Sequence, residues 1–118
     1  HIKEGRSTYE ATLICQTHML ALAEAFVERI CLQATAETIE KNKESSSYNL
    51  LRRLRSLYAL RTIEKHAAWY LEQDYLAAVK SKAIRRQVDQ LCAELRPEAV
   101  ALVDAFGIPE SLIAAPIA

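Results

Sequence analysis

Glycine and proline are scarce in this sequence. Its 118 residues include two glycines and three prolines. All-β sandwiches and barrels need many tight turns, which these residues supply, so the composition excludes them. Phosphate-binding loops and dinucleotide fingerprints need several glycines close together, whereas Gly5 and Gly107 stand alone. Ala, Leu, Glu, Arg and Lys are abundant instead and favour helices.

A surplus of basic charge is also missing. Fifteen Lys and Arg residues balance fifteen Asp and Glu residues, which argues against general nucleic-acid binding. The local exception is the stretch "LRRLRSLYALR", with arginines at 52, 53, 55 and 61. We expect a solvated helix face there, with a phosphate site as the less favoured alternative.

Cysteines and targeting segments give further exclusions. Cys15, Cys31 and Cys92 are odd in number and widely spaced, so they favour a reducing compartment over a disulfide framework. Each lies in an apolar helical run, where we expect small buried side chains rather than reactive thiols. The sequence contains no secretion signal and no uncharged apolar run long enough to span a membrane.

Metal-binding and catalytic signatures are absent as well. The sequence has no CxxC or HExxH motif, and His18 and His66 fall on different predicted helices. Glu64 and His66 are two residues apart, which places them on different faces of a helix. We therefore predict no metal site and no catalytic residue in this chain.

Hydrophobic periodicity predicts three long helices. The first covers about 8–43, the second about 48–73, and the third begins near 79–82. The polar stretch "KNKESSS" separates the first two, and Ser46 or Ser47 is expected to cap the second helix. The third helix has an inner stripe of apolar residues, namely Ile84, Val88, Leu91 and Leu95.

The C-terminal part is apolar and punctuated by proline. Pro97 predicts a kink or short break, followed by helix over 99–106 and a stop at Gly107. Pro109 can open one more turn through Leu112 and Ile113. We expect this part to close the bundle through Val100, Val103 and Phe106.

These elements predict an all-α fold. Short connections favour an up-down antiparallel bundle of three long helices, with a short C-terminal helix and an apolar tail. Residues 1–118 are expected to form a single helical domain.

Two groups of residues are candidates for a functional site. In "EKHAAWYLEQDY", the aromatic residues Trp69, Tyr70 and Tyr75 could line a pocket with Glu64, His66 and Glu72, but core or interface packing is favoured. Asp104 lies in an apolar run, where a buried carboxylate would need a structural partner, a ligand or another domain.

The second half of the chain resembles the C-terminal domain of acyl-CoA oxidases over about 50–109. The matching motifs are Leu-Tyr-Ala-Leu at 57–60, Ile-Glu at 63–64 with its aromatic pair Trp69 and Tyr70, Leu-Cys-x-Glu-Leu-Arg-Pro at 91–97, and Ala-Val-x-Leu-Val-Asp-Ala-Phe at 99–106.

The resemblance implies a parent flavoenzyme. Acyl-CoA oxidases use FAD to convert acyl-CoA to trans-2-enoyl-CoA and produce hydrogen peroxide. Their catalytic glutamate and most flavin and CoA contacts lie upstream of this domain, so no catalytic or cofactor-binding residue is assigned and no cofactor is expected in this fragment. The ending "APIA" resembles the shorter bacterial ending and lacks a Ser-Lys-Leu peroxisomal address, so a bacterial cytoplasmic location is expected.

We expect the chain to pack on the remaining domains of that enzyme and on a second subunit. The residues predicted at these contacts are Trp69, Tyr70, Phe106, Ile108, Leu112 and Ile113. Two alternatives stay open, an independent helical protein-interaction module and a small ligand-binding bundle around Trp69 and His66.

Overall fold

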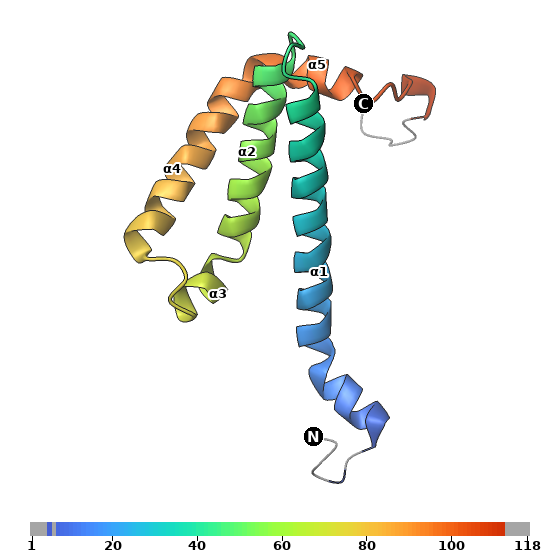
Figure 1. Cartoon of the computed structure of the whole chain (residues 1–118), viewed down its shortest axis with the longest axis vertical. Helices are drawn as coiled ribbons and strands as arrows, with labels where there is room; N and C mark the ends of the chain where they lie inside the picture. Colours follow the sequence, from blue (N-terminus) through green and yellow to red (C-terminus); the bar gives the residue numbers. More distant parts are fainter. Residues whose placement is uncertain (1–4, 6, 113–118) are drawn as a thin grey trace. The chain divides into compact units, whose positions relative to one another are not determined.

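The structure is a computed structural model that describes residue 5 and residues 7–112. Throughout this part of the chain it contains helices and their connections and no strand, as Figure 1 shows. The predicted all-α fold is therefore confirmed. The chain divides into two compact units, His1–Ser45 and Ser46–Ala118, and each is described by itself. The arrangement of the long helices as one up-down bundle, and the single domain, stay predictions.

The first unit contains one long helix, α1, which spans Thr8–Lys41. A capping box starts it: the Ser7 Oγ accepts a hydrogen bond from the Glu10 backbone N–H at 3.2 Å. In return, the Glu10 carboxylate accepts one from the Ser7 backbone N–H at 3.0 Å. The helix ends when the Asn42 N–H donates to the Ile39 carbonyl. Both ends lie close to the predicted range of 8–43.

Helix α1 exposes much of its apolar surface. A single helix has no second element of its own unit against which to bury an apolar stripe. Eight large apolar side chains are accordingly more than two-fifths exposed, namely Leu13, Ile14, Met19, Leu20, Leu22, Phe26, Val27 and Ile30. Cys31 is also exposed, and Cys15 is partly buried. The expected burial of the cysteines is therefore wrong for Cys31, and likewise for the exposed Cys92 of the second unit.

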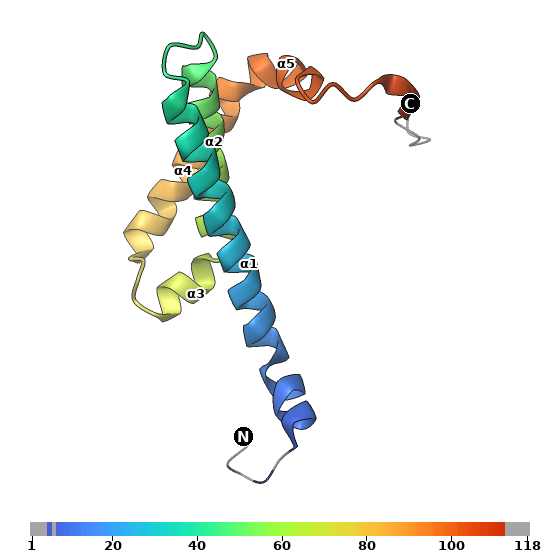
Figure 2. The ribbon, with the colours of Figure 1, turned by 45° about the vertical axis from the view of Figure 1, so that its right-hand side comes forward.

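The second unit is built on a pair of helices, α2 (Tyr48–Lys65) and α4 (Ala78–Leu95). They run antiparallel and lie side by side in both Figure 1 and Figure 2. The predicted apolar stripe of α4 supplies the core, because Val88, Leu91 and Leu95 are each at most 6% exposed. The sequence thus predicted the correct inner face of this helix.

The predicted second helix is broken near its end. Helix α2 stops at Lys65, and a separate short helix, α3, covers Ala67–Glu72. The break lies at His66, whose φ of −103° and ψ of 16° leave the helical region. Ser47 occupies the N-cap position of α2, but its side chain makes no capping hydrogen bond to the helix. Its own backbone is already helical there, so the predicted serine cap does not form.

A left-handed residue ends α3. Asp74 has a φ of +56°, and its N–H donates to the Leu71 carbonyl. The next N–H, that of Tyr75, donates to the Tyr70 carbonyl at 3.0 Å. These two bonds form a Schellman motif, which satisfies carbonyls that the helix end would leave without partners. The chain therefore turns at Asp74, and Tyr75 folds back towards α3.

The chain leaves the helix pair after α4. A 3-10 turn, Arg96–Glu98, contains Pro97, and it is followed by the short helix α5, Ala99–Asp104, and another 3-10 turn, Glu110–Leu112. The predicted break at Pro97 is confirmed, and α5 ends two residues before the end of the predicted range, ahead of the left-handed Gly107, with a φ of +62°. Because the turn at Pro97 directs α5 away from α2 and α4 (Figure 2), α5 does not pack over the core.

Two predictions for this segment are consequently wrong. Val100, Val103 and Phe106 do not close the bundle, since they are 73%, 67% and 77% exposed. Asp104 is exposed too, so its carboxylate bears no burial cost and needs no partner.

Candidate functional site

One concave surface of the second unit is a hollow lined by aromatic and aliphatic side chains. It has a volume of about 510 Å³ and is lined by Ile63, Trp69, Tyr70, Tyr75, Leu76 and Ile84. We call it the aromatic hollow. Residues from α2, α3, α4 and the α3–α4 turn contribute to it, and Trp69 remains 53% exposed.

Ring packing orders one wall of the aromatic hollow. The Trp69 ring lies at 78° to that of Tyr70, with centroids 5.3 Å apart. Tyr75 stacks on Trp69, with an interplanar angle of 26° and centroids 5.7 Å apart. Edge-to-face and offset-stacked pairs are the favoured aromatic geometries. The Schellman turn at Asp74 makes the second pair possible, because it reverses the chain and places Tyr75 beside α3.

The polar residues that the sequence offered for this pocket do not line it. Glu64 instead binds Arg61 of its own helix and faces Arg85 of α4. His66 is partly buried at the junction of α2 and α3, and Glu72 is exposed. The aromatic hollow is therefore apolar apart from the ring N–H and hydroxyl groups of Trp69 and the two tyrosines. Such a lining suits an apolar side chain and supplies no acid–base pair.

The predicted contact residues fall into two separate groups. Trp69 and Tyr70 belong to α3, whereas Phe106, Ile108 and Leu112 follow α5 and are 61–77% exposed. Figure 1 and Figure 2 both show α3 and α5 at opposite ends of α4. We call the second group, together with Val100 and Val103, the C-terminal apolar face. Ile113, the remaining predicted contact, lies outside the described residues.

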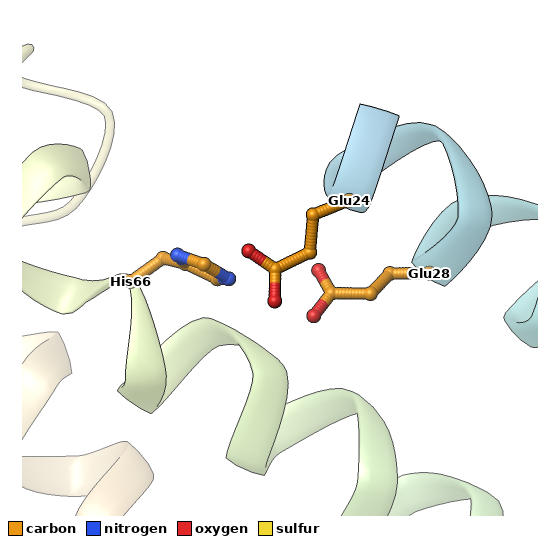
Figure 3. Close-up of side chains that lie close together, drawn as sticks. All are labelled: Glu24, Glu28 and His66. Carbon is orange, nitrogen blue, oxygen red and sulfur yellow. The ribbon is translucent and has the colours of Figure 1, made fainter. Parts of the chain in front are cut away.

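The charged side chains of α1 are weaker candidates for a functional site than the aromatic hollow. Figure 3 shows the Glu24 and Glu28 carboxylates, one turn apart, leaving the same side of α1, and the His66 ring at the end of α2. Two carboxylates on a helix surface are common and by themselves indicate no metal site. The Ser7 hydrogen bonds hold the pKa of the Glu10 carboxyl below its usual value, and this effect belongs to helix capping rather than to catalysis.

The capping box was the structural feature that the sequence reading missed. Its signal is present, since Ser7 is followed three residues later by Glu10, directly before an apolar periodic run. The pairing of Tyr75 with Trp69 had no comparable signal. It depends on a left-handed conformation at Asp74, which an aspartate adopts only in some contexts.

Comparison with known proteins gives one consistent family. The family model of acyl-CoA oxidase matches residues 1–118. The peroxisomal acyl-coenzyme A oxidase 3 of Arabidopsis thaliana is 38% identical over 98% of this chain, and peroxisomal acyl-coenzyme A oxidase 3 of Homo sapiens is 34% identical over 98%. A putative acyl-coenzyme A oxidase of Arabidopsis thaliana is 38% identical, again over 98% of the chain.

The match covers only part of these relatives. The chain spans 17% of the length of the first two and 62% of the putative oxidase. No solved structure matches the chain. Among the described residues, no helix combines the length and apolar character needed to cross a membrane.

Proposed function

The chain belongs to the acyl-CoA oxidase family, and from this membership we propose that it acts as the C-terminal helical domain of a larger FAD-dependent enzyme. That enzyme converts acyl-CoA to trans-2-enoyl-CoA with release of peroxide. In it, this chain packs against the other domains and against a second subunit. Its part is structural, and the chemistry takes place elsewhere in the polypeptide.

The observation that carries this proposal is the amount of exposed apolar surface. The second unit alone exposes Trp69, Tyr75 and the whole C-terminal apolar face. Soluble monomers rarely expose large contiguous apolar patches, which usually mark contact surfaces. Two such surfaces, at opposite ends of α4, fit a domain that is held by its neighbours at more than one place. The small share of the oxidase sequences that the chain covers supports the same proposal.

The described residues do not fit a complete flavin site. FAD needs donors or cations for its diphosphate as well as an apolar slot for its ring. The aromatic hollow has no cationic side chain in its lining, and Gly107 stands alone instead of forming a phosphate loop. We therefore assign the FAD of the parent enzyme to its other domains and route no chemical step through this chain.

The first test is activity of the isolated chain. The purified chain should retain no FAD after gel filtration and should produce no peroxide when acyl-CoA is added. A full oxidase from the same gene should do both. Flavin retention or acyl-CoA-dependent peroxide production by the 118 residues alone would overturn the proposal.

The second test is the gene itself. A reading frame that continues several hundred residues before His1 is expected. A start codon directly before His1 would favour the independent interaction module. The cytoplasmic location stays a proposal, and cell fractionation of the source organism would check it.

A further inference from the structure

The basic stretch of α2 has no place in the proposed packing role. From Tyr48 to Ile63 the helix carries four arginines and no acidic residue, although the whole chain has equal numbers of both charges. Arg52 and Arg53 share one exposed face of the helix with Asn49 and Ser56, which follow the i, i+3, i+4, i+7 spacing. These four residues line a single hollow of about 370 Å³, which we call the arginine hollow.

Local contacts restrain the two guanidinium groups. The Arg52 guanidinium lies over the Tyr48 ring, 5.5 Å from its centroid. The Arg53 Nε donates to the Asn49 carbonyl at 3.4 Å, which leaves its two terminal nitrogens available. Within the part of the chain that the structure describes, neither arginine is paired with a carboxylate. Both positive charges are therefore held in place without being neutralised.

The neighbouring helix end adds to this positive potential. The arginine hollow begins in the first turn of α2, at Asn49. No acidic residue lies in that turn, and the Ser47 side chain does not cap it. The positive end of the helix dipole and the backbone N–H groups there favour an anion. The Ser56 hydroxyl donates to the Arg52 carbonyl at 2.9 Å, so the donors for an anion come from the helix end, Asn49 and the two arginines.

We propose that the arginine hollow of α2 binds a phosphomonoester group through Arg52, Arg53 and the side-chain amide of Asn49. Guanidinium groups match the oxygen geometry of phosphate. Two of them balance the two negative charges of a phosphomonoester, whereas a single carboxylate ligand would balance only one of the two arginines. The group can be part of a soluble phosphate ester or of a lipid head group. This inference is independent of the proposed packing role, since it concerns a different face of the unit.

Inorganic phosphate added to the full chain at constant ionic strength provides the test. Saturable shifts of the Arg52, Arg53 and Asn49 side-chain NMR signals are expected, with a dissociation constant on the order of 1 mM. The double variant Arg52→Gln/Arg53→Gln should weaken binding at least about tenfold, because it removes both charge-assisted donors. Arg86→Gln/Arg96→Gln changes net charge by the same amount on other exposed residues and should leave binding unchanged.

Vesicles that contain phosphatidic acid separate the two sources. Vesicle binding that inorganic phosphate displaces assigns the site to a lipid head group. Binding of phosphate without binding of vesicles assigns it to a soluble ester. No saturable binding of either probe, an equal loss in both double variants, or binding of polyglutamate alone would overturn the proposal.

Discussion

Arg85 of α4 reaches across to Glu64 of α2, with its Nε 3.6 Å from the Glu64 Oε1. Arg61, three residues before Glu64, binds the other carboxylate oxygen. One carboxylate thus lies between two guanidinium groups from two helices. Its side chain is 21% exposed, while those of Arg61 and Arg85 are 63% and 68% exposed. Glu64 is therefore the central residue of this small charge network.

Replacing the central acid should destabilise the second unit. Glu64→Gln leaves the positive charges of Arg61 and Arg85 close together. We expect the free energy of unfolding to fall by about 1 kcal/mol, which is the upper end of the range for solvent-accessible ion pairs. Urea denaturation of the chain measures this. Added salt should reduce the difference between the variant and the parent chain, because ions screen these charges.

Glu72→Gln is the matched control for this substitution. Glu72 lies on the exposed side of α3, and no ion pair to it is present among the described residues. Its replacement should leave the urea midpoint unchanged within error. Equal effects of the two substitutions would refute a specific role for the Glu64 network.

The buried stripe of α4 should dominate stability. Leu91 is 6% exposed and lies between Val88 and Leu95 in the core. Leu91→Ala removes buried methyl groups and leaves a cavity, so we expect a loss of about 2–5 kcal/mol in the free energy of unfolding. Val79→Ala, at a position that is 73% exposed, should change it little. Denaturant titration of both variants, followed by circular dichroism, provides the comparison.

The left-handed turn at Asp74 should tolerate glycine well. A residue with a Cβ is strained at a φ of +56°, so Asp74→Gly should raise the free energy of unfolding, by up to about 1 kcal/mol. The same change in the middle of α4, Asp89→Gly, should lower it by roughly a few tenths of a kcal/mol, because glycine is a poorer helix former than aspartate. Thermal melting distinguishes the two directions. A lower melting temperature for Asp74→Gly would contradict the strain argument.

Acidification should fray the start of α1. Hydrogen bonds from Ser7 lower the pKa of the Glu10 carboxyl in the folded state. The ionised Glu10 therefore stabilises the folded helix start, and this contribution is fully present above the ordinary carboxyl pKa. It is lost as the pH falls through the lowered pKa, because the protonated group no longer accepts the same bonds. The protection factor of the Glu10 amide, taken from hydrogen exchange relative to the intrinsic rate at each pH, should then fall. Ser7→Ala removes the side-chain hydrogen bond but keeps the backbone N–H, so the Glu10 pKa should rise only part of the way towards its usual value, as an NMR titration would show.

The sequence predicted helix positions better than helix environments. Val88, Leu91 and Leu95 are buried as their spacing indicated, because a helix pair selects one face of α4. Val100 and Val103 have similar spacing, yet they are exposed. Their orientation depends on the turn at Pro97, and a proline signals a break without giving its direction.

The candidate site was predictable in composition but not in shape. The aromatic residues were recognised in the sequence, and Trp69 and Tyr70 do line the aromatic hollow. Glu64 and His66 were grouped with them because they are close in sequence. In the structure the break at His66 and the Arg85 contact place both outside the lining. Sequence proximity could not reveal contacts that arise from a second helix.

Trp69 provides the last prediction, since it is the only tryptophan and reports on the aromatic hollow alone. Because it is 53% exposed, acrylamide should quench its fluorescence readily in the isolated chain. In the full oxidase, the proposed packing should shield it and shift its emission to shorter wavelength. Phe106→Ser, at the other end of α4, should leave quenching in the isolated chain unchanged. An emission change on adding acyl-CoA to the isolated chain would instead favour the small ligand-binding bundle. A chain whose role is packing has no acyl-CoA site near Trp69, so its emission should not change.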